Sequence, residues 1–229
     1  MKTVLLDVQG LKMHLDLTQN LDLQYAQGVY DKEEIEFLLS SYEEESYFLD
    51  VGANQGFYSL FFAKHKPNAR ILAFEPDPYN VEKFQKNISA NKFRNIKVCP
   101  YALSDSDEPK DLMINTTNNR GGNSMVFSQT PWQKKDVKMK VPCKTLLGAL
   151  NANEVHRIGA LKIDIEGYEF PVLKRFFEDA PQDLYPKAIV VEAFGHTINR
   201  VTGSPIELLI RREYRLINHT SFNYFFLFR

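Results

Sequence analysis

The stretch FLDVGANQGFYSL, residues 48–60, decides the fold. The apolar run 48–51 suits a buried strand, and the run 58–62 suits a helix face. Two glycines, an aspartate and an asparagine lie at the junction of these runs. Glycine lets the backbone turn sharply and approach a ligand closely, and the start of the following helix offers free N–H groups. The stretch therefore predicts a strand–turn–helix junction that is either a tight bend or one wall of a small-molecule site.

The composition is that of an ordinary soluble globular protein, with 229 residues, 44% of them hydrophobic and 25% charged. This length suits one α/β domain with a large core. The net charge of −1 gives no reason to expect nucleic-acid binding, which usually needs a concentrated basic face. No apolar run approaches the ~20 residues of a membrane-spanning helix. The N-terminal residues alternate in hydrophobicity and include Asp7, unlike a secretion signal, so we expect a cytoplasmic protein.

The two cysteines, Cys99 and Cys143, lie far apart and outside any CxxC pattern. This spacing argues against a disulfide framework and against a structural zinc site. We expect both to be buried small hydrophobic residues in a reducing compartment.

Apolar strand candidates alternate with amphipathic helix candidates through most of the chain. The strands are expected at 46–51, 70–75, 95–103, 159–165 and 187–194, and the helices at 30–42, 56–66, 78–91 and 167–179. This alternation is typical of a parallel sheet covered by helices on both faces. The C-terminal residues 212–229 add an antiparallel strand pair. We predict an α/β, Rossmann-like fold with a mostly parallel seven-stranded sheet.

Two further segments complete the predicted organisation. Residues 3–17 alternate around Gln9-Gly10 and predict an extra N-terminal β-hairpin. Residues 104–143 predict an inserted hairpin with a flexible loop at 115–130, which either covers a site or is a plain surface loop. We expect one domain over 1–229, in which 1–45 form the N-terminal hairpin and leading helix and 46–229 form the core.

Carboxylates follow almost every predicted strand of this sheet. They are Asp50, Glu75 and Asp77, Asp105, Asp164 and Glu166, and Glu192. In an open α/β sheet the ligand binds at the carboxyl ends of the strands. We therefore expect an acid-lined site at that edge.

The expected acids indicate which ligand the site takes. Asp50 suits a cationic amino group, Glu75 suits the two hydroxyls of a ribose, and Asp105 suits the exocyclic amine of an adenine. Together these groups match S-adenosylmethionine. A nicotinamide dinucleotide is the competing ligand, but the spacing Gly52-x-x-x-Gly56 is not the GxGxxG of a pyrophosphate site, and the acids would repel a pyrophosphate.

The chain resembles the FkbM-type methyltransferases, a branch of the class I fold that uses S-adenosylmethionine. The resemblance is carried by FLDVGANQGFYSL (48–60), AFEPDP (73–78), ALSDSD (102–107), GGNSM (121–125) and LKIDIEGYEFPVLK (161–174). Upstream, GVYDKEEIEFL (28–38) resembles the helix that leads into the domain in that family.

The resemblance implies a role for each strand end. The loop from Asp50 to Ser59 would hold the methionine end, Glu75 the ribose, and Asp105 with the backbone around Leu103 the adenine. Asp164 would face the methionine end and the reacting methyl group. Tyr30 is added because its position suits a pocket wall. The predicted cofactor-binding residues are Tyr30, Asp50, Gly52, Ala53, Asn54, Gly56, Phe57, Tyr58, Ser59, Glu75, Pro76, Asp77, Ala102, Leu103, Ser104, Asp105 and Asp164.

Methyl transfer to a hydroxyl benefits from a general base. The predicted catalytic residues are Asp164, Glu192 and His196, although a surface histidine is a nearly equal alternative for His196. Glu166 is interpreted first as a cap of the helix that follows it, and second as a site residue. Asp164, Glu192 and His196 could together hold a divalent ion, but no spacing requires one, and we expect no metal site. Arg120 and Asn123 in the loop are candidate substrate contacts.

The sequence thus predicts an S-adenosylmethionine-dependent methyltransferase, with O-methylation of a natural product or sugar implied by the family resemblance. The alternatives are N-methylation of peptide amide side chains and a non-catalytic S-adenosylmethionine-binding module. The expected partner is a small-molecule or peptide methyl acceptor, and a homodimer is compatible with the sequence. Neither nucleic acid nor a membrane is expected as a partner.

Overall fold

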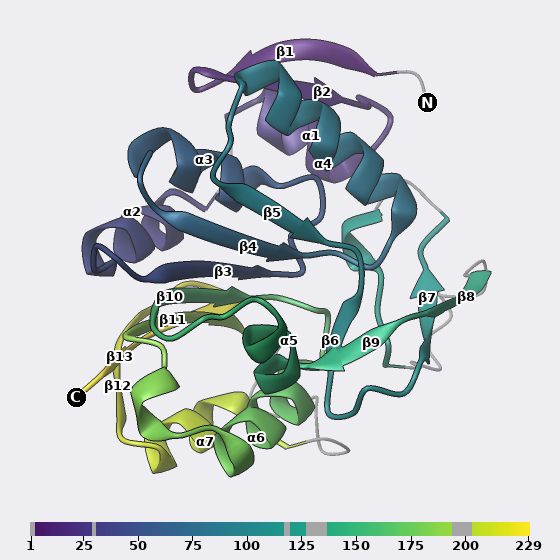
Figure 1. Cartoon of the computed structure of the whole chain (residues 1–229). Coiled ribbons are helices and arrows are strands. Elements are labelled where there is room, and N and C mark those ends of the chain that lie inside the picture. The colour runs from purple at the N-terminus through teal and green to yellow at the C-terminus, as the bar shows by residue number, and fades with distance from the viewer. Residues whose placement is uncertain (1–2, 29–30, 117–119, 127–136, 194–202) are drawn as a thin grey trace.

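A seven-stranded sheet forms the centre of the protein in a computed structural model that describes residues 3–28, 31–116, 120–126, 137–193 and 203–229 (Figure 1). Its strand order is β12 (Tyr214–His219), β13 (Asn223–Phe228), β11 (Ala188–Glu192), β10 (Ile158–Ile163), β3 (Tyr47–Val51), β4 (Arg70–Phe74) and β5 (Ile96–Cys99). The five strands from β11 to β5 run parallel, and β13 is antiparallel to both of its neighbours. The mostly parallel sheet with an antiparallel C-terminal pair is therefore confirmed.

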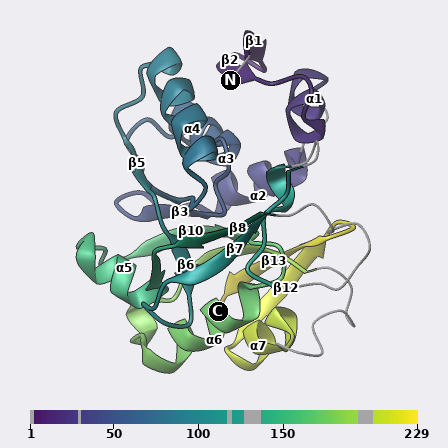
Figure 2. The same ribbon diagram turned by 90° about the vertical axis from the view of Figure 1, so that its right-hand side faces the viewer.

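Helices cover both faces of this sheet, as Figures 1 and 2 show. One face carries α2 (Lys32–Ser41), α3 (Phe57–His65) and α4 (Pro78–Asn91). The other face carries α5 (Leu146–Ala152), α6 (Glu169–Asp179) and α7 (Pro205–Arg211). Short 3₁₀ turns lie elsewhere in the chain, at Arg120–Gly122 and Gln182–Leu184. The two-sided cover explains why the central strands are apolar nearly throughout.

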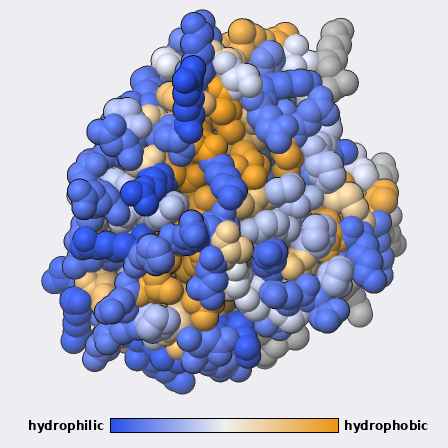
Figure 3. Space-filling view, viewed as in Figure 1, coloured by the Kyte–Doolittle hydropathy of each residue, from blue (hydrophilic) through white to orange (hydrophobic). Residues whose placement is uncertain are grey.

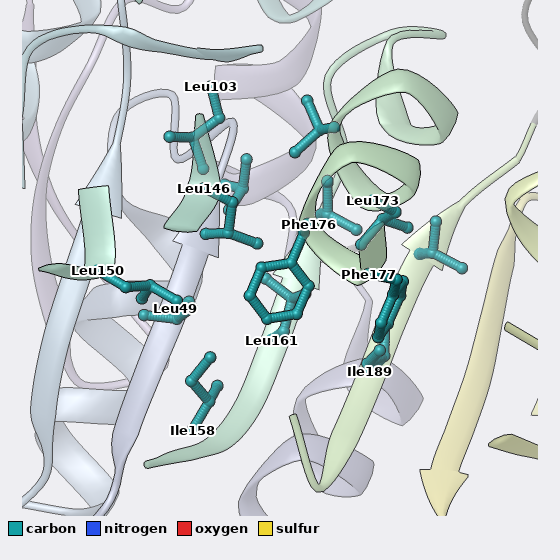
Figure 4. Packing of buried hydrophobic residues seen from close by; sticks show 14 of the residues in the cluster. Leu49, Leu103, Leu146, Leu150, Ile158, Leu161, Leu173, Phe176, Phe177 and Ile189 are labelled. Carbon is teal, nitrogen blue, oxygen red and sulfur yellow. The ribbon is translucent and has the colours of Figure 1, made fainter. Parts of the chain in front are cut away.

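Alternate residues of each central strand enter different cores. Leu49 and Val51 of β3 join the core beneath α5 and α6, seen close up in Figure 4. Phe48 joins the core on the α3 side, where its ring stacks on Phe62 at a centroid distance of 4.0 Å. Asp50 has the same parity as Phe48, so its side chain lies on the α3 face of the sheet.

The N-terminal segment forms the predicted hairpin and an additional helix. β1 (Val4–Val8) pairs antiparallel with β2 (Leu11–Leu15) around the turn at Gln9-Gly10. The segment continues into α1 (Asn20–Ala26), which the sequence did not predict. β2 docks on α4 through two hydrogen bonds between the Lys12 backbone and the Asn91 side chain.

The strand predicted at 95–103 is wrong in its second half. β5 ends at Cys99, and Ala102–Ser104 forms β6, which pairs with β9 (Cys143–Thr145) in a separate two-stranded sheet. Pro100 lies at the break, and proline has no N–H to donate to a strand ladder. The inserted hairpin is confirmed as β7 (Lys110–Ile114) and β8 (Val137–Val141).

The surface mixes hydrophilic and hydrophobic residues. On the face in Figure 3, hydrophobic residues gather near the middle and hydrophilic ones surround them. Cys99 and Cys143 are both buried with free thiols, as the sequence predicted. Within the described residues, every helix is too short or too polar to cross a bilayer.

Candidate active site

A pocket lies at the carboxyl ends of β3, β4 and β10. The predicted residues that line it are Gly52, Asn54, Glu75, Pro76, Ala102, Leu103 and Asp164. The remaining lining residues are Val51, Phe74, Asn80, Leu112, Arg120, Gly121, Asn123, Met125, Ile165 and Glu166. Four separate stretches of the predicted site therefore converge, as the rule for open α/β sheets requires.

Both glycines of the 52–56 loop adopt positive φ, 78° at Gly52 and 89° at Gly56. A Cβ on Gly52 would lie 1.8 Å from the backbone oxygen of Asp164, and a Cβ on Gly56 would lie 1.9 Å from the ring of Phe84. Glycine is therefore required here by packing against β10 and α4. The sharp turn expected from the sequence is confirmed by the positive φ values, the close packing is an additional reason, and close approach of a ligand stays a prediction.

Glu75 follows β4 and is 95% buried. Its Oε2 accepts the Asn54 N–H at 2.8 Å, and its Oε1 accepts from the Asp77 N–H at 2.9 Å and the Asn80 amide at 3.3 Å. Burial raises the pKa of Glu75 to about 7, against the opposing effect of these hydrogen bonds. The 52–56 loop and the start of α4 are thus tied to one buried carboxyl group.

Asp77 serves α4 and the segment above the pocket. Its Oδ1 caps α4 by accepting the Tyr79 N–H at 3.0 Å. Its Oδ2 accepts from Arg120 and Asn123, each at 3.0 Å. Asp77 itself does not line the pocket. Its hydrogen bonds anchor Arg120 and Asn123, which do.

Asp50 is fully buried beneath the loop, away from the pocket lining. Its Oδ2 accepts from the Ser59 hydroxyl at 2.6 Å and the Ser59 N–H at 3.1 Å, and its Oδ1 has no partner among the described residues. Burial raises the pKa of Asp50, and Lys162 opposes this shift. The hydrogen bonds of Asp50 thus go to Ser59 of helix α3. A contact of Asp50 with a cofactor stays a prediction.

The other predicted residues of this loop are packed into the core. Phe57 stacks on Tyr25 at a centroid distance of 4.4 Å, and the Tyr58 hydroxyl donates to Asp31 at 2.7 Å. Ala53 donates its N–H to the Phe74 carbonyl, as Gly52 does. These contacts position the loop from behind, and none of the three residues lines the pocket.

Ser104 and Asp105 lie beside the pocket at the end of β6. The Asp105 Oδ1 accepts from the Ser104 hydroxyl at 2.9 Å and the Tyr168 hydroxyl at 3.0 Å, and lies 3.1 Å from the Lys110 amine. These donors lower the pKa of Asp105, against the opposing effect of its burial. The contact of Asp105 with an adenine stays a prediction. The adenine amine would have to compete with these donors for the carboxylate.

Asp164, Glu166 and Glu192 bring carboxylate oxygens within 4.8 Å of one another. Burial and the neighbouring acids raise the pKa of Glu166 to about 8 and that of Glu192 to about 12. Glu192 lies outside the pocket lining, whereas the other two acids belong to it. We call these three residues the acidic cluster; Glu166 and Glu192 hold their protons near neutral pH.

Lys162 adjoins the acidic cluster and was missed in the sequence. Its amine lies 3.2 Å from Asp164 Oδ2 and over the ring of Tyr58, and its side chain is 95% buried. Burial lowers its pKa, but the Asp164 and Asp50 carboxylates outweigh burial and raise the pKa above the usual value. A lysine inside the apolar strand 159–165 was a usable signal, because a buried charge needs a partner.

Neither Glu166 nor any other described side chain caps the start of α6, and Glu169 instead accepts hydrogen bonds from the turn that leads into this helix. The Glu169 Oε1 accepts from the Ile165 N–H at 2.8 Å and the Gly167 N–H at 3.2 Å, whereas α6 starts only at Glu169. Glu166 adopts a φ of 55°, unusual for a residue with a side chain, and lines the pocket. The interpretation of Glu166 as a cap was therefore wrong.

Two predicted site residues, Tyr30 and His196, lie outside the described residues. Their assigned roles stay predictions.

The comparisons with known proteins agree with this arrangement. The sequence model of the Methyltransferase FkbM domain matches residues 50–215, from the first strand-end aspartate to β12. The chain belongs to the FkbM methyltransferase family. It is thereby a methyltransferase domain that uses S-adenosylmethionine, and the family predicted from the motifs is confirmed.

Curated relatives are similar over more than half of the chain. Methyltransferase 1 of Beauveria bassiana is 26% identical over 66% of this chain and 66% of its own length. The Hexuronic acid methyltransferase AglP of Haloferax volcanii is 26% identical over 63% of this chain and 55% of its own. The matches thus span less than two thirds of these relatives.

Solved structures share the class I Rossmann-like methyltransferase fold at low sequence identity. The Pyrococcus abyssi tRNA (uracil-54, C5)-methyltransferase in complex with S-adenosyl-L-homocysteine is 13% identical with a TM-score of 0.52, over 99% of this chain and 43% of that chain. The METTL16 MTase domain is 14% identical with a TM-score of 0.50, over 95% and 72%. At this identity the likeness shows the fold alone.

The chemistry of the pocket fits the cofactor of the family. Glu75 offers a buried carboxylate at the end of β4, where a ribose can donate two hydroxyls. Leu103, Leu112 and Met125 supply an apolar wall suited to an adenine. The residues present therefore suit S-adenosylmethionine, and Asp164 and Glu166 of the acidic cluster line the same pocket.

Proposed function

We propose that this chain transfers the methyl group of S-adenosylmethionine to a hydroxyl of a natural product or sugar. The observation that supports this proposal is the acidic cluster, whose members Asp164 and Glu166 line the same pocket as Glu75. A cofactor-binding module without turnover needs the ribose carboxylate but has no need of three crowded acids.

The cofactor supplies the hard chemistry, an electrophilic methyl group on a sulfonium. The residues of the chain have to bind it, place the acceptor oxygen in line with the methyl group and remove a proton. We assign ribose binding to Glu75 and the methionine end to the backbone of Gly52 and Asn54. Positioning of this kind contributes ~7–11 kcal/mol to lowering the barrier in favourable cases.

Asp164 is the proposed proton acceptor. Asp164 lines the pocket. Glu192 does not line it, and its pKa is raised to about 12, so its carboxyl group stays protonated. Lys162 lies 3.2 Å from Asp164 and balances part of its charge. Because this lysine already supplies a cation, we propose that the reaction needs no metal ion.

The acceptor class is the least constrained part of the proposal. A relative is named a hexuronic acid methyltransferase, which supports a sugar-type acceptor for this chain. N-methylation of a peptide amide is the alternative, and it depends even more on a base, because the nitrogen lone pair of an amide is delocalised into the carbonyl group and is not nucleophilic until the proton is removed. We propose a small-molecule acceptor; the homodimer, the cytoplasmic location and the single-domain division stay predictions from the sequence.

A methyl-transfer assay with labelled S-adenosylmethionine tests the proposal. The acceptor panel should contain free sugars, hydroxylated polyketides and amide-bearing peptides, each with and without EDTA. Transfer to a hydroxyl that is insensitive to EDTA is expected, and transfer only to amides would contradict the proposal.

Variants of the acids test the proton acceptor. Asp164→Asn should lower kcat by ~10²-fold or more, in the range of general-base contributions, and Glu192→Gln and His196→Ala complete the series. Glu178→Gln changes an acid of α6 that is half exposed and paired with Lys174, so it is the matched control. Full rates in all three site variants would overturn the assignment of the base.

A further inference from the structure

Three buried polar side chains join the N-terminal segment to the 52–56 loop. Asp22 of α1 and Lys83 of α4 are each 3% exposed, and Gln55 of the loop is fully buried. Asp22 Oδ2 forms an ion pair with the Lys83 amine, and Asp22 Oδ1 accepts the Gln55 side-chain amide at 2.6 Å. One carboxylate thus holds α4 and the loop at the same time.

The loop needs such support because of its backbone. Asn54 adopts a φ of 50° between two glycines at 78° and 89°. Glycine adopts this left-handed region freely, and asparagine tolerates it better than most residues with a side chain. Because glycines also leave many other conformations open, contacts from the surrounding structure have to select this one.

The contacts act on opposite sides of the loop. On the pocket side, the Asn54 N–H donates to Glu75 Oε2. On the far side, the Gln55 carbonyl accepts from the Asn87 amide at 3.1 Å, and the Gln55 amide donates to Asp22. The Gln55 Oε1 has no partner within the described residues, so the contact with Asp22 fixes the orientation of this amide.

The N-terminal hairpin belongs to the same support. The Asn87 Oδ1 accepts the His14 N–H of β2 at 2.7 Å, and Asp22 Oδ2 also accepts the Asp16 N–H at 2.5 Å. β2 packs along α4 (Figure 1), and α1 reaches that helix through the Asp22–Lys83 ion pair. The residues of this segment precede residue 50, where the match to the family model begins.

Thermal stability alone is a poor reason for this arrangement. Two charges taken out of water lose solvation, and replacing a buried ion pair with apolar side chains of similar size is often neutral or stabilising. Burial lowers the pKa of Lys83 in spite of the adjacent carboxylate, which shows the penalty of desolvation.

We propose that Asp22 is a positioning residue for the cofactor: through Gln55 it holds the 52–56 loop in the conformation that binds the methionine end. The N-terminal hairpin and α1 are thus part of the cofactor-binding machinery. This inference rests on the proposed function, in which Gly52 and Asn54 receive that end of the cofactor.

Two double variants of the full chain isolate the contact. Asp22→Leu with Lys83→Met removes the ion pair and the acceptor for Gln55, whereas Asp22→Asn with Lys83→Met removes the ion pair but keeps one oxygen that can accept from Gln55. We expect S-adenosylhomocysteine to bind at least fivefold more weakly to the Leu/Met variant than to the Asn/Met variant in titration calorimetry. The urea midpoints of the two variants should be compared in parallel.

A single variant tests the loop from the other end. Gln55→Leu leaves the Asp22–Lys83 pair intact, so it should fold even if a double variant does not, and it should lose S-adenosylhomocysteine affinity at least fivefold. Lys86→Met on the exposed face of α4 is the control, because the ion pair of Lys86 within the described part of the chain is with exposed Glu82. Its affinity should equal that of the wild type.

The outcomes separate the two proposals. Affinities within twofold of the wild type for Gln55→Leu and the folded Leu/Met variant would overturn the positioning role of Asp22 while leaving the proposed function intact. Equal losses of affinity in the Leu/Met and Asn/Met variants that track their urea midpoints would show a purely structural role and overturn it as well. A wild-type chain that does not bind S-adenosylhomocysteine would contradict the proposed function and, with it, this inference.

Discussion

Glu75 is a buried carboxyl group whose two oxygens both accept hydrogen bonds, from the N–H groups of Asn54 and Asp77. Burial raises its pKa to about 7. A ribose hydroxyl is a donor, and a donor favours the ionised carboxylate. The affinity for the cofactor should therefore rise as the pH rises through this pKa.

We predict that S-adenosylhomocysteine binds several-fold more tightly to the wild type at pH 8 than at pH 6. Glu75→Gln should bind it about tenfold more weakly at pH 8, since a hydrogen bond to a charged group contributes ~1.5–3 kcal/mol, and its affinity should be flat over this range. Titration calorimetry at the two pH values is the measurement. A Glu75→Gln variant with the wild-type pH dependence would place the titrating group elsewhere.

Glu192 has the largest raised pKa of the acidic cluster, about 12. Below the ordinary glutamate pKa both the folded and the unfolded chain hold this proton. Above it the unfolded chain ionises while the folded chain does not, so Glu192 lowers stability increasingly as the pH rises from about 4.5. The burial of Glu192 at the end of β11 is therefore a cost to stability at neutral pH.

Glu192→Gln should raise the melting temperature at pH 8 by about 2 °C or more, on the scale of ~2–4 °C for each kcal/mol in a chain of this size. The gain should disappear near pH 4, where the carboxyl group is neutral in both states. Differential scanning calorimetry at both pH values checks this. An equal gain at both pH values would contradict the electrostatic cause.

At the residue scale, the sequence predicted the convergence of Glu75 and Asp164 but missed Lys162 and Glu169. Glu75 and Asp164 could be predicted as site residues because each directly follows an apolar strand. The contacts of Asp77 with Arg120 and of Asp105 with Tyr168 join residues that are tens of positions apart, and only the folded chain brings them together.

At the scale of single elements, the junction between β3 and α3 depends on a close contact at Gly56. Gly56 packs its backbone against the ring of Phe84 on α4, and any Cβ there would overlap that ring. The positive φ of Gly56 adds strain for every other residue.

Gly56→Ala should therefore destabilise the protein by about 1–3 kcal/mol, the usual range for overpacking. Phe84→Leu on its own opens a space, and combined with Gly56→Ala it should lose less stability than the two single changes would sum to. Urea denaturation of the four proteins of this cycle measures the coupling. Strict additivity would show that the glycine is required by φ alone.

The elements that the sequence predicted best are those with long apolar or periodic runs. The central strands, α3, α4 and α6 were found close to their observed ends. The seven-residue helices α1, α5 and α7 were missed because a short helix carries too few turns to show a period. The break at Pro100 was missed because the apolar run continues across it.

At the scale of the whole molecule, the FkbM domain and the N-terminal segment both hold the 52–56 loop. Glu75 holds that loop from the pocket side and Asp22 holds it from behind. The sequence predicted the hairpin and the pocket separately. It gave no sign of their connection, because Gln55 and Asp22 appear in it only as isolated polar residues.

The most direct test is titration calorimetry of the full chain with S-adenosylhomocysteine and, separately, with NAD. We predict saturable binding of S-adenosylhomocysteine at one site per chain, no binding of NAD, and at least tenfold weaker binding of S-adenosylhomocysteine to Glu75→Ala. The last value follows from the loss of a charged hydrogen-bond acceptor. Tight binding of NAD, or an unchanged affinity of Glu75→Ala for S-adenosylhomocysteine, would contradict the placement of the cofactor in this pocket.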